Sequence, residues 1–144
     1  MYKRILVPTD GSEITAKAVQ TAVAMARLFG ARIDALTVKK PFDYAGISEM
    51  APVSPSDFQA TQNRLAEQRL ASIVEACAAA GVPHTVTAVE ADRPHEAIID
   101  HAQATGCELI VMASHGRRGV SALLLGSETQ KVLTHSKLPV LVVR

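Results

Sequence analysis

The chain has 144 residues, of which 48% are hydrophobic and 20% charged, a balance typical of a globular domain and not of a disordered segment. Its 15 Lys and Arg against 14 Asp and Glu leave a net charge of +1, which argues against a nucleic-acid-binding protein held by a basic field. Aromatic residues are only 3% and Trp is absent, so a platform that stacks single-stranded bases is also unexpected.

Cysteine usage and hydropathy favour a cytoplasmic protein without a membrane anchor. The two cysteines, Cys77 and Cys107, are too few for a disulfide framework and suit buried thiols in a reducing compartment. The N-terminal residues enter a strand pattern at once and lack the apolar core of a signal peptide. No apolar run approaches the roughly 18 residues that a bilayer-spanning helix needs.

The first half of the chain alternates short apolar runs with longer helical patterns. Residues 4–7 form an apolar run stopped by a proline, which predicts a buried strand. An alanine-rich helix follows, capped by Ser12 and ending at Gly30. Residues 31–38 predict a second strand, and residues 39–55, with three prolines and one glycine, predict a loop.

The pattern continues through the middle of the chain. A capping box at residues 56–59 predicts a long helix that runs to Ala80, and its apolar stripe is typical of a core-facing helix. Residues 84–90 alternate as a strand does. Pro94 suits the first position of a third helix, which we expect to run to Thr105.

The last third of the chain supplies two more strands and a fourth helix. Residues 107–113 predict a buried strand, and a loop over 114–126 leads to a second capping box at 127–130 that opens a helix to about residue 135. Residues 139–143 predict the final strand. The order βαβαβαβαβ predicts a single α/β domain over residues 1–144, with a doubly wound, mainly parallel open sheet.

Two of the predicted loops carry residues suited to a phosphate. In doubly wound folds, ligands lie beyond the carboxyl ends of the strands. Here Thr9 and Asp10 follow the first strand, and the glycine-containing loop follows the fourth. Glycine lets the backbone approach a phosphate, and a helix that begins near Ser127 offers N–H groups to it. Plain turn chemistry accounts for the same residues, so both interpretations stay open. The Walker loop, the dinucleotide fingerprint and the nucleophile elbow are absent.

The histidines give no clear catalytic or metal pattern. His115 beside Ser114 looks like a nucleophile pair, but neighbouring side chains at a strand end usually diverge, and no carboxylate is evident to orient the imidazole. The remaining histidines lack the spacing of a metal site, and we expect surface or edge positions for them; they are His84, His95, His101 and His135.

The whole chain resembles the universal stress protein family. The matching segments are KRILVPTDGSE at the start, MASHGRRGVSALLLGS in the fourth loop and KLPVLVVR at the end. Nucleotide-binding members of that family carry a phosphate loop of the form G-x2-G-x9-G-[ST]. Gly116 matches the second glycine, residues 117–125 fill the gap, and Gly126 with Ser127 completes the motif. Ala113 replaces the first glycine and places a methyl group where backbone would approach the ligand.

This resemblance implies the strand order 3-2-1-4-5 and an adenine-nucleotide site. The implied contacts are Asp10 and Val38 at the adenine and ribose, Pro8 and Thr9 in the same wall, Arg117, Ser127 and Thr129 near the phosphates, and Met112, Ala113, Gly116 and Gly126 completing the set. It also implies ATP or another adenine nucleotide as ligand, with Mg²⁺ or Mn²⁺ on the phosphates.

The resulting functional expectation is a cytoplasmic stress-response module that binds adenine nucleotide and turns over no substrate. We expect a homodimer joined through residues 139–143, an apolar edge strand, and neither nucleic acid nor membrane as a partner. One alternative is a slow ATP hydrolase, slow because the loops supply no clear general base. Another is a family member that acts through protein contacts without nucleotide, which Ala113 favours and the intact Gly116 and Gly126 oppose.

Overall fold

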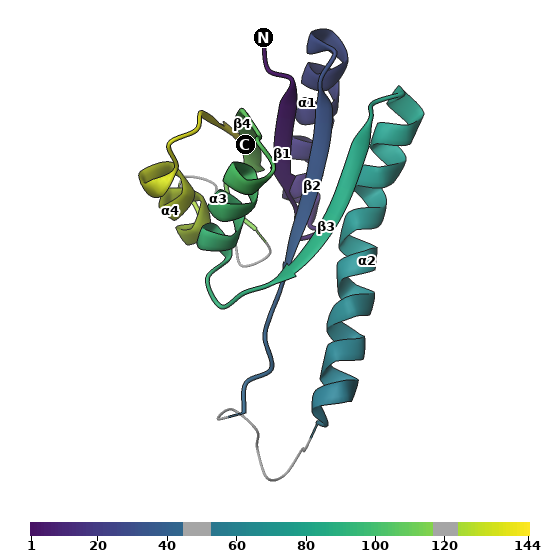
Figure 1. Ribbon diagram of the computed structural model, residues 1–144, viewed down its shortest axis with the longest axis vertical. Coiled ribbons are helices and arrows are strands. Elements are labelled where there is room, and N and C mark those ends of the chain that lie inside the picture. Colours follow the sequence, from purple (N-terminus) through teal and green to yellow (C-terminus); the bar gives the residue numbers. More distant parts are fainter. Residues whose placement is uncertain (45–52, 117–123) are drawn as a thin grey trace.

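The computed structural model describes residues 1–44, 53–116 and 124–144. In these residues strands and helices alternate along the chain (Figure 1). The strands are β1 (Arg4–Pro8), β2 (Arg32–Lys39), β3 (His84–Glu90), β4 (Leu109–Ala113) and β5 (Val140–Val143). The helices are α1 (Glu13–Phe29), α2 (Pro55–Ala80), α3 (Pro94–Ala104) and α4 (Ser127–His135).

The strands form one parallel sheet in the order β3-β2-β1-β4-β5, which confirms the expected α/β fold. In the middle of the sheet Leu6 of β1 lies between Asp34 of β2 and Ile110 of β4. Because the order reverses at this point, the carboxyl ends of β1 and β4 lie side by side, where the loops can form a ligand site.

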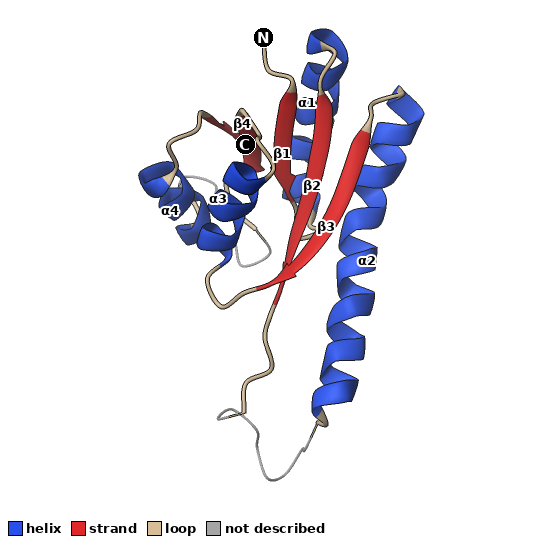
Figure 2. Cartoon of the chain, in the orientation of Figure 1, coloured by secondary structure: helices blue, strands red, loops and turns tan. Residues whose placement is uncertain are grey.

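Helices cover both faces of the sheet. Figure 2 shows α1 and α2 on one face and α3 and α4 on the other. Side chains of β1 alternate between the two faces of the sheet and pack in both cores. Ile5 and Val7 lie in the cluster under α1 and α2, whereas Leu6 lies in the cluster under α3 and α4. The central strands are therefore apolar on both sides, as the short unbroken apolar runs predict.

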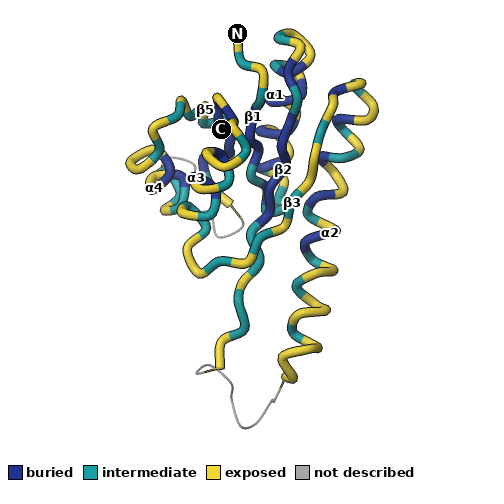
Figure 3. Tube along the Cα trace, viewed as in Figure 1, coloured by how far each residue is buried: buried dark blue, intermediate teal, exposed yellow. Residues whose placement is uncertain are grey.

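Burial falls off toward one edge of the sheet (Figure 3). β3 is mostly exposed or half-buried, and its Val86 is 46% exposed. The first half of α2 extends past the sheet and is largely exposed, whereas Leu70, Ile73 and Cys77 in its second half are buried. Cys77 and Cys107 are both buried and unbridged, as expected.

The predicted capping box at residues 56–59 is wrong. α2 begins at Pro55, and Ser54 caps it by accepting a hydrogen bond at Oγ from the N–H of Asp57 at 3.1 Å. The sequence offers two overlapping Ser-x-x frames, and the earlier one places proline at the first helical position, where its missing N–H costs nothing.

The predicted caps of α1 and α4 also need correction. Ser12 is the N-cap of α1, but its side chain makes no capping hydrogen bond. α4 begins at Ser127 itself with Gly126 as its N-cap, so the capping box at 127–130 is wrong.

The other boundaries shift by one or two residues. The strands predicted at 31–38, 107–113 and 139–143 begin later than expected, and the third helix ends at Ala104 with Thr105 as its C-cap. Parts of the predicted loops, residues 45–52 and 117–123, lie outside the described residues. In the described parts of the chain, no helix is both long and apolar enough to cross a membrane.

Candidate functional site

The loop after β1 is held by its own polar groups. The N–H of Thr9 donates to the carbonyl of Leu36 on β2 at 2.9 Å, which continues the sheet by one residue. Asp10 Oδ1 accepts a hydrogen bond from the N–H of Ser12 at 3.0 Å and lies 3.3 Å from Thr15 Oγ1, which donates to it. Asp10 therefore acts as a turn carboxylate, and its Oδ1 is fixed at the start of α1.

Two glycines bring the loop after β4 against this turn. A Cβ atom on Gly116 would lie 2.5 Å from Asp10 Oδ2, so only glycine fits without moving that carboxylate. A Cβ atom on Gly126 would lie 3.0 Å from the Cα of His115 and 3.3 Å from the carbonyl oxygen of Ser114. The N–H of Gly126 donates to that same carbonyl at 2.7 Å. The two ends of the loop therefore meet each other and one end meets Asp10.

The start of α4 is anchored to the end of β4. The buried hydroxyl of Thr129 donates to the carbonyl of Ala113 at 2.9 Å. Gly126 carries no side chain and so provides no capping acceptor, which leaves the first-turn N–H groups of α4 to partners from outside the helix. Ser127, at the first position of the helix, is exposed. The positive end of the helix dipole lies here.

The remaining candidate residues lie at the same end of the sheet. Pro8 ends β1, Val38 is the next-to-last residue of β2, and Met112 and Ala113 end β4. Met112 packs toward α3 and α4, whereas the methyl group of Ala113 belongs to the buried cluster under α1. Arg117 lies outside the described residues.

Arg69 is a residue at this edge that the sequence analysis missed. Its Nη1 donates to the carbonyl of Val38 at 3.4 Å, and its stem packs against Gly11, whose φ is +77°. Arg69 lies on α2, and only the packing of that helix reveals its proximity to the ends of β1 and β2. No sequence motif links it to Val38, 31 residues earlier.

The side chains of Ser114 and His115 were expected to diverge, but they contact each other. Ser114 Oγ and His115 Nδ1 are 3.1 Å apart and form a hydrogen bond. Ser114 is buried directly after β4, and its N–H donates to the carbonyl of Val143 at 2.8 Å. The pair directly precedes Gly116, which is the residue that lies against the Asp10 carboxylate.

Glu128 and His95 form a second contact without a sequence signal. Glu128 Oε2 accepts hydrogen bonds from the N–H of His95 at 2.8 Å and from its Nδ1, 3.1 Å away. Burial raises the pKa of the Glu128 carboxyl, but hydrogen bonds from Lys131 and His95 outweigh it, so the net pKa is lowered. The carboxyl is therefore ionised at neutral pH.

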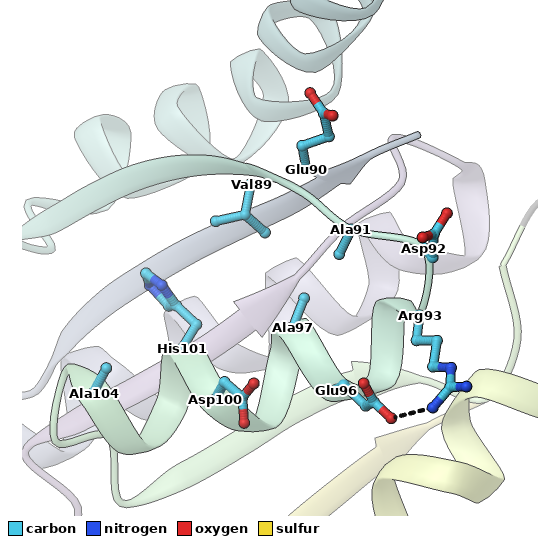
Figure 4. A pocket seen from close by; sticks show the side chains of 10 residues that line it. All are labelled: Val89, Glu90, Ala91, Asp92, Arg93, Glu96, Ala97, Asp100, His101 and Ala104. Carbon is cyan, nitrogen blue, oxygen red and sulfur yellow. Dashed lines mark hydrogen bonds and ion pairs between the residues drawn. The ribbon is translucent and has the colours of Figure 1, made fainter. Parts of the chain in front are cut away.

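A groove of about 660 Å³ lies elsewhere, between β3 and α3 (Figure 4). None of the expected ligand residues lines it. Its side chains include four carboxylates, which would repel phosphates; they are Glu90, Asp92, Glu96 and Asp100. Across residues 1–44, 53–116 and 124–144, no three His, Cys, Asp or Glu side chains are grouped as a metal site would require.

Comparison with known proteins agrees with this architecture. The model of the universal stress protein family matches residues 1–144. A universal stress protein of Thermus aquaticus is 37% identical over 145 residues and is covered in full, as is this chain. The solved structure of MJ0577, a universal stress protein of Methanocaldococcus jannaschii, is 30% identical with a TM-score of 0.84, and the match covers 99% of this chain and 96% of that one.

A third match is a universal stress protein solved in complex with cAMP. It is 25% identical with a TM-score of 0.73, and the match covers 99% of this chain and 97% of that one. The match of the family model over the full length, together with the identity to the Thermus aquaticus relative, identifies this chain as a member of the universal stress protein family.

Proposed function

We propose that this chain is an adenine-nucleotide-binding universal stress protein that acts as a regulatory module and turns over no substrate. ATP is the proposed ligand, and it lies between the carboxyl ends of β1 and β4. The protein acts in the cytoplasm as one domain over residues 1–144 and assembles as a homodimer.

The observation that carries this proposal is the contact between Gly116 and Asp10. A Cβ atom at residue 116 would fall 2.5 Å from Asp10 Oδ2, so a larger residue here would displace the Asp10 carboxylate and change the contact between the loop after β4 and the turn after β1. Gly126 makes the same kind of approach to His115 at the other end of the loop. The first-turn N–H groups of α4 receive no side-chain cap from Gly126, and N–H groups of this kind are suited to binding an anion.

A relative supports the ligand class. The universal stress protein solved with cAMP shares the fold over nearly the whole of both chains. In our proposal Asp10 and Val38 flank the ribose and adenine, with Pro8 and Thr9 beside them. The phosphates lie near Ser127; the remaining members of the proposed set are Met112, Ala113, Gly116, Arg117, Gly126 and Thr129.

The described residues fit a metal that travels with the nucleotide better than a resident one. No three metal-ligating side chains are grouped in the described parts of the chain. Mg²⁺ commonly takes one or two carboxylates plus phosphate oxygens and water. In our proposal Mg²⁺ or Mn²⁺ is held mainly by the phosphates, whose charge it partly neutralises, and the Asp10 carboxylate lies against Gly116 of the loop.

Two measurements test the proposal. Mass spectrometry of small molecules released from freshly purified, denatured protein should identify an adenine nucleotide. Calorimetric titration with ATP, ADP, AMP and cAMP should then give the preference, and Gly126→Val should abolish binding because its side chain would meet the backbone of His115. Asp10→Ala, which creates no clash, should also weaken nucleotide binding. This second variant tests the proposed site if Gly126→Val fails to fold. Unchanged affinity in both variants would move the site elsewhere.

A slow ATP hydrolase is the second candidate. The observation that favours it is the hydrogen bond between Ser114 Oγ and His115 Nδ1, which holds an imidazole at the start of the loop. Incubation of the protein with ATP should produce ADP if this candidate is right, and His115→Ala should then slow the reaction.

Ala113 bears on the last alternative, a stress protein that acts through protein contacts alone. If its methyl group crowds the ligand, Ala113→Gly should tighten binding several-fold, although glycine in a strand costs about 0.5–1 kcal/mol of stability. Failure of the wild-type protein to bind any of the four nucleotides would favour this alternative.

A further inference from the structure

The first turn of α4 carries a carboxylate that reaches across to α3. Glu128 is the second residue of α4 and follows directly after Gly126 and Ser127. Its Oε2 accepts the hydrogen bonds from His95, and its Oε1 accepts one from Lys131 Nζ at 3.1 Å. Both oxygens of the carboxylate are therefore engaged, although the side chain is 36% exposed.

This carboxylate performs the capping that α3 lacks locally. Arg93 is the N-cap of α3 and makes no side-chain capping hydrogen bond. Glu128 supplies the missing acceptor to the N–H of His95, the second residue of α3, from another helix. The imidazole of His95 adds a second hydrogen bond to the same oxygen, and its side chain is only 12% exposed. The first turns of α3 and α4 are thus joined.

α4 is consequently fixed at its start from two sides. Thr129 ties it to the end of β4 through the carbonyl of Ala113, and Glu128 ties it to α3 through His95. Two attachments on consecutive residues restrain both the position and the direction of the helix. The direction matters for a ligand, because the N–H groups and the dipole of a helix favour an anion only along its axis.

We propose that Glu128 and His95 are positioning residues that aim the N-terminus of α4 at the phosphates of the bound nucleotide. This inference rests on the proposed function. It assigns the pair to phosphate binding alone, because the adenine and ribose side of the proposed site is built from the ends of β1 and β2. Loss of the pair therefore weakens binding of ATP and leaves binding of adenosine unchanged.

Charge and position make opposite predictions for Glu128. Its negative charge close to the phosphates opposes their binding, and the ammonium group of Lys131 offsets that charge. If charge dominated, both Glu128→Ala and Glu128→Gln would tighten binding of ATP. If position dominates, Glu128→Ala weakens it, whereas Glu128→Gln keeps an oxygen that accepts from the N–H of His95 and restores most of the affinity.

The test is calorimetric titration of the full chain with ATP and with adenosine. Loss of one or two hydrogen bonds at the helix start should lower ATP affinity about five- to tenfold in Glu128→Ala. Glu128→Gln should stay within about threefold of wild type, and His95→Ala, which retains the backbone N–H, should fall between them. Glu96→Ala is the matched control, since Glu96 lies in the same turn of α3 and bonds only to the exposed Arg93 among the described contacts.

Equal losses for ATP and adenosine in Glu128→Ala would overturn the inference, as would unchanged ATP affinity. If Glu128→Ala fails to fold, His95→Ala tests the inference in its place. It should lower the affinity for ATP and leave the affinity for adenosine unchanged. A wild-type protein that binds neither ligand overturns the proposed function and this inference together. Normal binding of ATP to wild type and to all variants overturns the inference only.

Discussion

Asp34 on β2 and Arg4 on β1 form a partly buried charge pair in which Arg4 Nε donates to Asp34 Oδ2 at 2.7 Å. Asp34 is 1% exposed and also accepts a hydrogen bond at Oδ1 from Thr85 on β3 at 2.7 Å. Arg32 Nε lies 3.8 Å from the same oxygen. The carboxylate thereby links three neighbouring strands near their amino ends, away from the edge where the candidate nucleotide site lies.

This pair predicts a loss of stability in acid. Burial raises the pKa of Asp34, but hydrogen bonds from Arg4 and Thr85 and the charges of Arg4 and Arg32 outweigh it, so the folded-state pKa is lowered. The carboxylate therefore contributes its full stabilisation above the unfolded pKa, about 3.9, and loses it as pH falls through the folded-state pKa.

The variant Asp34→Asn checks this linkage. It should lower the free energy of unfolding by about 1.5–3 kcal/mol at pH 7, since two strong hydrogen bonds to a charged group are weakened. The difference from wild type should shrink below about pH 4. Urea unfolding at pH 7 and again below about pH 4 measures this difference in the free energy of unfolding. Asp100→Asn is the control because Asp100 is exposed on α3. A difference that stays constant with pH would contradict the assigned charge state.

Sequence patterns predicted the elements of the fold well because each depends on local periodicity. The unbroken apolar run before Pro8 and the alternation in β3 both arise from the side-chain period of a strand. The order of the strands did not follow from periodicity; it came from the resemblance to the family. Helix caps were less predictable, since a Ser-x-x pattern occurs in two overlapping frames at residues 54–59 and only packing selects one.

The candidate site was predictable only for residues that belong to a recognisable sequence motif. Gly116 and Gly126 stand in a motif, and the structure shows close approach at both. Arg69 and Glu128 have no such signal, because their partners lie 31 and 33 residues away and meet them through helix packing. Contacts of this kind depend on how α2, α3 and α4 sit on the sheet, which periodicity does not encode.

Gly116→Ala should impair binding with little effect on folding. The new methyl group displaces the Asp10 carboxylate, a side-chain end that can rotate away, so the free energy of unfolding should change by less than about 1 kcal/mol. ATP affinity should fall about tenfold if Asp10 contacts the nucleotide. In an Asp10→Ala background the same glycine change should add little, because the two act through one contact. Additive losses measured by calorimetry would show that Gly116 acts independently of Asp10.

The two cysteines should be inert in the folded protein. Burial raises the pKa of the Cys77 thiol, and it is also the largest influence on the Cys107 thiol, whose pKa is raised. Both thiols are therefore mostly protonated at pH 8 and react poorly as nucleophiles. A colorimetric disulfide reagent should react slowly with native protein and rapidly with both thiols in denaturant. Fast reaction of one equivalent under native conditions would mean that one of these thiols is accessible.

The backbone of β5 suggests how a homodimer would form. β5 pairs with β4 on one side, and in the described sheet no strand follows it on the other. The carbonyls of Pro139 and Val143 accept hydrogen bonds from the N–H groups of Ile110 and Ser114, in and directly after β4. Alternation therefore directs the N–H and carbonyl groups of Val140 and Val142 toward the free edge. Leu141 is 36% exposed, and no charge interrupts the strand. Such an edge invites pairing with another strand.

We therefore expect two copies to pair antiparallel through β5 about a two-fold axis. Val142→Pro removes an N–H on the free edge and spares the hydrogen bonds to β4, so it should convert a dimer to a folded monomer. Leu141→Lys should do so through charge repulsion across the axis. Light scattering at micromolar concentration measures the mass, with Val86→Lys on the opposite edge strand as the control, since that residue is also exposed. A monomeric wild-type protein would refute the dimer; dissociation by Val86→Lys alone would place the interface at β3, because only contacts on that edge would then be lost.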